Sequence, residues 1–563
     1  MRPWGMDMTC ATSAQTDRFV HNRLPPPEQR AQLRYDAPEL QIAAQANLVV
    51  ELLDNAVGHK GWASQPMLRS SKITLSYTDV QDRVNRIAQV LTEDLQLVSG
   101  NRVLLRGGNS IGMALAWLAV VKAGLIAVAT MPLLRAKELG EIIDKAQPSV
   151  ALCDAKLLDE LTTAQHQHAV LRTIVPFNAM NDPAGLAHRA TQKNGQFTVC
   201  ATAADDIAMM AFTSGTTGKP KAAVHTHRDI LAACEAWPRH VLRAVPSDIV
   251  VGSPPLAFTF GLGGLLVFPM WAGCSVYFAD EPYTPESMVD TINTVGATIC
   301  YTAPTFYRQM APFARAKGVP RLRTSISAGE GLADATRELW QQSTALHMLD
   351  GIGATELFHI FISSPGVDAD AQRGKLKHLG LPGTPIGKVV PGYSAKVVGD
   401  DGVEVPRGTV GRLAVIGPTS CKYMDDARQT NYVKNGWNFP GDAFVQDDDG
   451  YYYYQSRADD MIISAGYNIG GPEVEDCLLQ HPAVAECGVV GQPDAQRGMI
   501  VKAFCVLRPT YCADDAMVHA LQDHVKTQLA PYKYPREIVF LPHLPRTETG
   551  KLQRFKLREV GNA

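Results

Sequence analysis

One run of residues decides the fold and the kind of site: Phe212-Thr213-Ser214-Gly215-Thr216-Thr217-Gly218-Lys219-Pro220-Lys221. Its hydroxyl groups and backbone N–H groups can surround phosphate oxygens, while its lysines offset their charge. It is not a Walker A loop, because Gly215 and Gly218 are three apart and Lys219 is followed by proline instead of Ser or Thr. The density of the pattern predicts a phosphate-binding loop rather than a flexible surface loop.

The segments on both sides of this loop alternate between helix and strand patterns. Upstream, apolar residues recur at helical spacing over 80–91, behind an expected N-cap at Thr78-Asp79, and a short apolar run follows at 103–105. Downstream, short apolar runs are typical of buried strands in an α/β arrangement. These runs cover residues 249–251, 275–278 and 297–301. We therefore expect a mostly parallel sheet covered by helices.

The pattern changes twice towards the C-terminus. After about residue 385, short β-type runs punctuated by glycine, such as 394–398, 411–416 and 450–454, predict a small barrel or antiparallel sheet. From residue 458, helical and strand patterns alternate in a compact α+β domain. Its expected elements are helices at 473–479 and 516–529 and strands at 484–490, 500–507 and 538–541.

The predicted fold class is α/β, with a large N-terminal domain of α/β layers plus a small β-barrel-like part, followed by a small α+β C-terminal domain. We expect a polar, mobile leader over residues 1–30, the large domain over 31–457 and the mobile C-terminal domain over 458–563. A chain of 563 residues is too long for one hydrophobic core, which agrees with this division.

Composition excludes several classes of partner. The chain has 53 Lys and Arg against 56 Asp and Glu, so no global charge attracts nucleic acid or an anionic membrane. Eleven cysteines without a CxxC pair fit neither a disulfide framework nor a zinc site and favour a reducing cytoplasm. The apolar stretches 111–134 and 262–278 are interrupted, and the N-terminus lacks a signal-peptide pattern. We expect small-molecule partners, no nucleic acid and no membrane.

Four further motifs follow the loop in a fixed order. They are Gly353-Ala354-Thr355-Glu356, Gly441-Asp442, Arg457-Ala458-Asp459-Asp460 and Pro545-Arg546-Thr547-Glu548-Thr549-Gly550-Lys551. Taken singly, each has a plainer interpretation as solvated charge or a turn. Their joint order resembles the adenylate-forming superfamily, which includes acyl-CoA synthetases, adenylation domains of peptide synthetases and luciferases. These enzymes activate a carboxylate as an acyl-adenylate.

The resemblance implies a role for each motif. Thr355 would approach the α-phosphate of ATP and Glu356 would hold Mg²⁺, while Asp442 would accept the two ribose hydroxyls. The other roles implied are ribose contact for Arg457, the hinge between the domains for Asp459 and catalysis for Lys551.

The sequence departs from the commonest family pattern beside these motifs. Ile352, between Gly351 and Gly353 of the nucleotide segment, stands where many relatives have a tyrosine that stacks on adenine. The stack here would be aliphatic. Pro440 and Ser456 replace the usual threonine and glycine of the two ribose motifs.

The segment Pro255-Leu256-Ala257-Phe258-Thr259-Phe260-Gly261 resembles the family's aromatic gate at the acid pocket. Amino-acid-activating relatives place an aspartate here, whereas this chain has alanine and phenylalanine. Because an unpaired ammonium in a neutral pocket is costly, an α-amino acid substrate is disfavoured.

Ser327-Ala328-Gly329-Glu330 and the stretch 349–361 resemble benzoate- and 2-aminobenzoate-CoA ligases. The flat aryl pocket that this implies is walled by Ala257, Phe258, Ala328, Gly329 and His359, with the histidine near the ring or the carboxylate. A histidine between two apolar neighbours is as typical of a hydrogen-bonded core residue, and both interpretations of His359 stay open.

The run 456–469 and the opening 18–28 resemble the 2-aminobenzoate branch most, so 2-aminobenzoate, or else benzoate, is the expected substrate. The residue that reads the ortho substituent is not located by the sequence. Gly466-Tyr467-Asn468 resembles the loop that lines the CoA thiol tunnel, where glycine lets the pantetheine approach the backbone. The implied cofactors and co-substrates are ATP, Mg²⁺ and CoA.

Two other functions stay open at this point. One is an aryl-acid adenylation enzyme that loads a separate carrier protein, and the other is a nucleotide-binding regulator without turnover. The regulator is disfavoured because mere binding needs neither the hinge residue Asp459 nor Lys551. A homodimer is compatible with the sequence.

Overall fold

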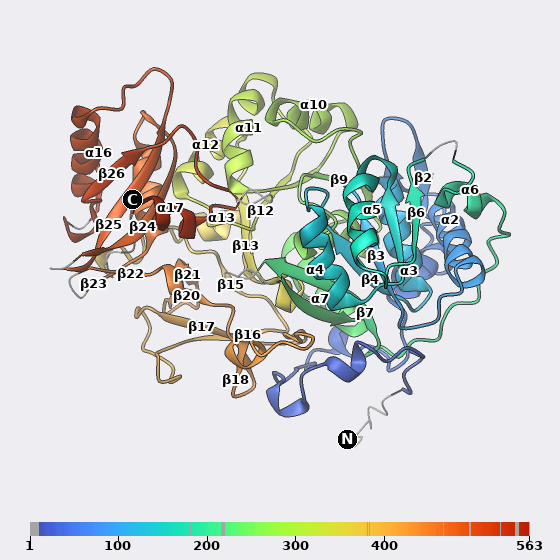
Figure 1. The fold of residues 1–563 in the computed structure, drawn as a ribbon. Coiled ribbons are helices and arrows are strands. Elements are labelled where there is room, and N and C mark those ends of the chain that lie inside the picture. The colour runs from blue at the N-terminus through green and yellow to red at the C-terminus, as the bar shows by residue number, and fades with distance from the viewer. Residues whose placement is uncertain are drawn as a thin grey trace, which may run out of the picture.

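The computed structural model describes residues 11–179, 182–214, 220–379, 381, 383–464, 467–494, 497–529, 531–546 and 551–561. Four sheets organise these residues. Figure 1 shows the α/β layers of the large domain in blue to yellow-green, with the C-terminal domain in red beside them. The predicted α/β class, with a large N-terminal and a small C-terminal domain, is confirmed.

The first sheet carries the phosphate loop. Its strand order is β6-β5-β3-β4-β7-β8, parallel throughout except for the antiparallel pair β7 and β8. Its strands are β3 (Arg102–Arg106), β4 (Ile126–Thr130), β5 (Val150–Asp154), β6 (Thr173–Phe177), β7 (Ile207–Ser214) and β8 (Pro220–Thr226). The helices among and before them are α1 (Asn55–Gly58), α2 (Tyr77–Gln89), α3 (Ile111–Lys122), α4 (Ala136–Ala146), α5 (Leu158–Gln167) and α6 (Leu186–Thr191).

The second sheet has a parallel centre and antiparallel edges. Its order is β15-β14-β13-β12-β11-β9-β10-β1-β2. Its strands are β1 (Pro66–Arg69), β2 (Thr74–Ser76), β9 (Ile249–Gly252), β10 (Ser275–Tyr277), β11 (Ile299–Thr302), β12 (Thr324–Ser327), β13 (Met348–Gly353), β14 (Ile360–Ser363) and β15 (Lys388–Val389). Its helices are α7 (His227–Trp237), α8 (Thr259–Leu262), α9 (Phe268–Ala272), α10 (Pro285–Val295), α11 (Pro304–Lys317), α12 (Asp334–Thr344) and α13 (Gly366–Asp370). One large core joins both sheets through α2, α3 and α7.

The third sheet is antiparallel, as the glycine-punctuated pattern predicts. Strands β16 (Ser394–Val398) and β17 (Gly411–Ile416) coincide with the runs expected there. The other elements are α14 (Gln429–Tyr432), β18 (Val433–Lys434), β19 (Trp437–Asn438), β20 (Asp442–Gln446) and β21 (Tyr452–Arg457). In Figure 1 this sheet lies below the C-terminal domain, to which β21 leads.

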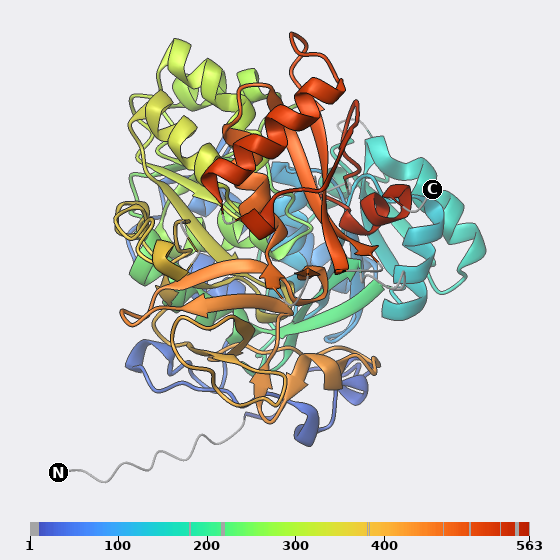
Figure 2. The same ribbon diagram turned by 90° about the vertical axis from the view of Figure 1, so that its left-hand side faces the viewer.

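The C-terminal domain has its own sheet and its own core. The strand order is β23-β22-β25-β24, and β26 pairs in parallel with β25. The elements are β22 (Ile462–Ser464), β23 (Tyr467–Ile469), α15 (Gly471–Gln480), β24 (Val484–Asp494), β25 (Gly498–Leu507), α16 (Asp515–Gln528), β26 (Glu537–Phe540) and α17 (Arg554–Gly561). Figure 2 views the molecule from the side on which this domain lies.

Two local expectations need correction. The helix expected to be capped by Thr78-Asp79 begins at Tyr77, because Ser76 is the N-cap and forms a capping box with Asp79. The Ser76 side chain accepts from the Asp79 N–H at 3.1 Å, and the Ser76 N–H donates to the Asp79 carboxylate at 2.8 Å. Asp79 is therefore the third residue of the helix, not its cap.

The leader expected to be mobile packs on the large domain over its described part, residues 11–30. Val20 is fully buried, and the Gln15 side-chain amide donates to the Ile207 carbonyl of β7 at 2.7 Å. Asp17 pairs with Arg102 at the start of β3. Because most residues of this segment are polar, its composition did not indicate that these residues anchor it to the large domain. Within the described part of the chain, no helix combines the length and apolarity needed to cross a membrane.

Candidate active site

Three strands of the second sheet each run into a segment that the sequence assigned to the site. β9, β12 and β13 lead into residues 254–258, 328–330 and 355–356, respectively. These strands run parallel, with β11 between β9 and β12, so their carboxyl ends share one edge. Ligands of open α/β sheets bind outside that edge. The topology thus gathers segments that lie far apart in the sequence.

The phosphate loop connects β7 to β8. Gly215, Thr216, Thr217, Gly218, Lys219 and the side chain of Ser214 lie outside the described residues. At the described edge of the loop, the buried hydroxyl of Thr213 has no hydrogen-bond partner among the described groups. Since buried hydroxyls normally have partners, this one is available to a ligand oxygen and fits a nucleotide phosphate.

Glu356 is held by two side chains of the large domain. It lies in the short 3₁₀ helix η9 (Thr355–Leu357) and is buried. The Tyr423 hydroxyl donates to Glu356 Oε1 and accepts from Lys221 Nζ at 2.7 Å. Lys221 Nζ also lies 3.5 Å from Glu356 Oε1. Burial and the neighbouring carboxylate raise the pKa of Tyr423, which keeps it protonated as a donor.

Thr355 is fixed through its backbone. His225 of β8 is buried and donates from Nε2 to the Thr355 carbonyl oxygen at 2.7 Å. Burial lowers the pKa of His225 to about 4, so the ring is neutral near pH 7. Strand β8 of the first sheet therefore positions the segment that follows strand β13 of the second sheet.

A strained turn follows Glu356. Phe358 has φ +70° and ψ −51°, and the His359 N–H donates to the Leu357 carbonyl at 3.0 Å. This is a γ-turn of the rare, positive-φ kind, which a phenylalanine adopts only where its surroundings hold it. Phe358 is fully buried and packs edge-on against His225, with the ring centroids 5.5 Å apart.

The turn directs His359 into an aromatic cluster. Its ring lies 4.5 Å from that of Phe268, 5.4 Å from Trp237 and 5.8 Å from Phe260, measured between centroids. Neither ring nitrogen meets hydrogen-bond geometry with a described group, although the Phe260 backbone is near. Burial lowers the pKa of His359 to about 3, so the ring is neutral. His359 is thus a core residue, but not a hydrogen-bonded one.

The predicted gate segment is held by an asparagine. Asn109 donates from its side-chain amide to the Pro254 carbonyl at 2.9 Å and accepts from the Leu256 N–H at 2.8 Å. Ala257 follows and is buried, while Phe258 is partly buried against the large core. The two hydrogen bonds of Asn109 fix the backbone that leads into the predicted pocket.

The predicted ribose residues form a pair. Asp442 opens β20 and is the register partner of Arg457, which closes β21. Arg457 Nη1 donates to Asp442 Oδ1 at 3.2 Å and to the Pro440 carbonyl at 2.8 Å. The proline that replaces threonine thus contributes its backbone oxygen. Burial raises the pKa of Asp442, and Arg457 opposes that shift. Asp459, the predicted hinge, lies 3.9 Å from Arg457 Nε.

Lys551 reaches the site from the C-terminal domain. Its side chain is exposed to solvent, yet charged groups of the large domain surround its ammonium group. These surroundings lower the pKa of Lys551 chiefly by desolvation, while Glu330, Glu356 and Asp442 oppose the shift. A Cβ placed on Gly329, which has φ +92°, would lie 4.0 Å from Lys551 Cε. Lys551 is therefore next to the Ala328-Gly329 segment.

The remaining predicted residues divide between the two domains. Gly351, Ile352 and Gly353 lie on β13, where the register partner of Ile352 is Ile362 of β14. Tyr467 lies on β23 of the C-terminal domain, and its ring stacks on Tyr532 with the centroids 4.2 Å apart. Gly466 lies outside the described residues.

Glu356 is the carboxylate that the resemblance assigns to Mg²⁺ in this arrangement. The described residues contain no group of three or more His, Cys, Asp and Glu side chains that could hold a metal ion. Mg²⁺ at nucleotide sites is usually bound by one or two carboxylates, substrate phosphates and water, and Glu356 fits that pattern.

Comparison with known proteins shows the family of the chain. The family model described as an AMP-binding enzyme matches residues 56–423. The chain belongs to this family. A second model, the AMP-binding enzyme C-terminal domain, matches residues 473–551. The resemblance inferred from the motifs and the expectation of an enzyme are confirmed.

Similar proteins cover nearly the whole of this AMP-binding enzyme. The chain is 35% identical over 490 residues to benzoate–CoA ligase from Thauera aromatica, covering 86% of this chain and 90% of that protein. Among solved structures, an anthranilate CoA ligase in complex with anthranoyl-AMP has a TM-score of 0.85 and 30% identity, covering 93% of this chain and 99% of that one. A benzoate CoA ligase from Burkholderia xenovorans LB400 has a TM-score of 0.80 and 28% identity, covering 91% and 100%.

Sequence reasoning missed several residues of this AMP-binding enzyme. Tyr423, His225 and Asn109 contact site segments but belong to none of the motifs used. The only available signal was the pair of histidines, His225 and His227, at the end of an apolar strand pattern.

Proposed function

We propose that this AMP-binding enzyme is an ATP-dependent aryl-acid CoA ligase. It activates 2-aminobenzoate, or benzoate, as the acyl-adenylate and transfers the acyl group to CoA, releasing AMP and pyrophosphate. The observation that carries the proposal is the position of Lys551 beside Gly329. The wall of the predicted aryl pocket and the predicted catalytic lysine lie next to each other, where a bound carboxylate would be.

The preference for an aryl acid rests on the absence of a carboxylate from the gate segment 255–261. Ala257, Phe258 and the uncharged, buried His359 offer no carboxylate to pair with an ammonium. An ortho-amino group on an aromatic ring is barely basic and suits such surroundings. Similar proteins named for benzoate, 3-hydroxybenzoate and anthranilate support the same class.

In the first half-reaction, the substrate carboxylate attacks the α-phosphorus of ATP and the bond to pyrophosphate breaks. Lys551 offsets the charge on the carboxylate and phosphate oxygens, and Asp442 holds the ribose. The loop from Thr213 to Lys221 binds the leaving pyrophosphate. Mg²⁺, held by Glu356, would neutralise phosphate charge.

In the second half-reaction, the C-terminal domain turns about Asp459. Lys551 withdraws, and the Gly466-Tyr467 loop reaches the site. The CoA thiolate attacks the acyl carbonyl, the bond to the phosphate oxygen breaks, and AMP leaves. We place the reaction in the cytoplasm.

The test measures pyrophosphate release and AMP formation with MgATP. The acids are benzoate, 2-aminobenzoate, a medium-chain fatty acid and an α-amino acid, each with and without CoA. CoA-dependent AMP turnover on 2-aminobenzoate or benzoate is expected. Pyrophosphate release from an aryl acid that CoA does not affect would favour loading of a carrier protein. No turnover of any acid would overturn the proposal.

A further inference from the structure

Helix α12 of the large domain is capped by a residue of the C-terminal domain. Its N-cap, Ala333, has no side-chain acceptor for the N–H groups of the first turn. The Ala335 N–H donates instead to Asp476 Oδ1 at 2.8 Å. Asp476 belongs to α15, so the cap exists only while the two domains are docked. A carboxylate at this end of a helix also interacts favourably with the helix dipole.

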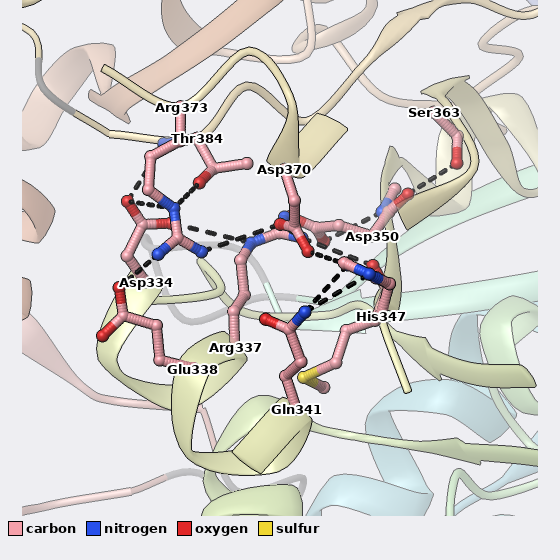
Figure 3. A network of polar contacts seen from close by, with 12 residues as sticks. Asp334, Arg337, Glu338, Gln341, His347, Asp350, Ser363, Asp370, Arg373 and Thr384 are labelled. Carbon is pink, nitrogen blue, oxygen red and sulfur yellow. Dashed lines mark hydrogen bonds and ion pairs between the residues drawn. The ribbon is translucent and has the colours of Figure 1, made fainter. Parts of the chain in front are cut away.

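The same helix is tied to the nucleotide segment. Arg337 of α12 is buried and donates to Asp350 Oδ2 at 2.8 Å and to the Met348 carbonyl at 3.3 Å. Both acceptors lie on β13, which continues into Gly351-Ile352-Gly353 and Glu356. Figure 3 shows Arg337 between Asp350 and Asp370, with Asp334 at the start of the helix. One helix therefore contacts both the docked domain and the predicted nucleotide strand.

The carboxylate of Asp476 lies near a second carboxylate, that of Asp334. Burial and the nearby Asp334 raise the pKa of Asp476, and Glu338 adds to the effect. The Asp334 carboxylate accepts from the Thr384 N–H at 3.1 Å and lies 3.8 Å from Arg373 Nε. Figure 3 shows these three residues together. Repulsion from Asp334 therefore opposes the attraction between the Asp476 carboxylate and the helix end, which weakens the contact between the domains.

Further contacts hold the domain in the same arrangement. Arg308 of α11 donates to the Leu479 carbonyl of α15 at 3.1 Å. Arg546 Nη1 of the C-terminal domain lies 3.2 Å from Glu330 Oε1. Glu330 follows Gly329, the residue beside Lys551. Docking of α15 and delivery of Lys551 therefore occur together.

We propose that Asp476 is a positioning residue for acyl-adenylate formation. By capping α12 it holds the C-terminal domain where Lys551 lies beside Gly329, and it releases the helix before the thioester forms. This inference rests on the proposed two-step function. It assigns to Asp476 a role in the first step alone.

The test compares Asp476→Ala and Asp476→Asn with the wild type in each half-reaction. Pyrophosphate release without CoA, in a single turnover, reports the first step. Thioester formation from preformed 2-aminobenzoyl-adenylate reports the second. Asp476→Ala is expected to slow the first step by about fivefold, the effect of losing one helix cap, and to leave the second unchanged or faster. Asp476→Asn, which keeps an acceptor oxygen, is expected to retain most of the rate.

Asp523→Ala, an exposed aspartate on α16, is the matched control and should leave both steps unchanged. A second variant, Asp334→Asn, removes the opposing charge and should slow thioester formation while sparing adenylation. Equal loss of both steps in Asp476→Ala, or an Asn variant as slow as the Ala variant, would overturn the role. If Asp476→Ala does not fold, Asp334→Asn tests the proposal instead. Thioester formation that is not slowed in Asp334→Asn would then overturn the role of Asp476. A wild type inactive on every acid would instead overturn the proposed function.

Discussion

The two halves of the candidate site are held in different ways. Glu356 is fixed by Tyr423 and Lys221, all within the large domain. Lys551 reaches the same place only across the domain boundary, where Arg546 meets Glu330. A half built into the large domain is present in both steps of the proposed reaction, whereas the other is present only while the domains are docked. Substitutions in the two halves should therefore differ in which step they affect.

The largest expected effect is that of Lys551→Ala. Adenylation should fall by about a hundredfold to a thousandfold, because one charge that stabilises the transition state is lost. Thioester formation from preformed acyl-adenylate should be spared. Rapid-quench assays of each half-reaction check this, with Lys556→Ala, an exposed lysine of the same domain, as control. Similar losses in both steps would contradict the division between the halves.

Asp442→Asn should give the opposite pattern, with both steps impaired by roughly tenfold to a hundredfold. The AMP moiety is bound in both, and the substitution weakens a charged hydrogen-bond acceptor and removes the ion pair between Asp442 and Arg457. The measurement is the same pair of half-reactions together with the KM for ATP. A loss confined to adenylation would show that Asp442 does not belong to the half used in both steps.

Tyr423→Phe should lower adenylation by about tenfold, since Glu356 loses its hydroxyl donor. The Mg²⁺ concentration for half-maximal activity should rise as well. Tyr432→Phe is the matched control, because its ring packs against that of Tyr423 and its buried hydroxyl has no partner among the described groups. An unchanged Mg²⁺ requirement in Tyr423→Phe would separate this tyrosine from the metal.

The smallest effect is expected for Asn109→Ala, which removes both hydrogen bonds to the gate segment. The KM for the aryl acid should rise by about threefold to tenfold, while the KM for ATP stays constant. Steady-state titration of each substrate measures this. A parallel rise in both KM values would indicate a general loss of structure instead of a loosened acid pocket.

Sequence reasoning located the residues that belong to contiguous motifs. Glu356, Asp442 and Lys551 were predicted in this way, and the structure brings their charges together. It could not find residues whose contact depends on folding alone. Tyr423 is separated from Glu356 by 67 positions, and Asp476 from Ala335 by 141. A lone tyrosine or aspartate carries no periodic or motif signal, so its partner becomes visible only in three dimensions.

The leader shows the converse failure. Its composition is that of a mobile segment, and most of its described residues are polar. A few anchors decide the outcome: Val20 fills a core position, and Gln15 and Asp17 bind β7 and β3. Averages over a segment cannot register such single contacts.

The strained turn at Phe358 has a consequence for redesign. The turn links Glu356 to the buried residue His359, three positions later in the sequence. Packing around Phe358 holds the backbone between them in its strained conformation. A smaller residue at position 359 would release that packing and is expected to displace the Glu356 carboxylate as well. Ala257 and Phe258 belong to a separate segment that Asn109 holds, so substitutions there need not disturb the turn.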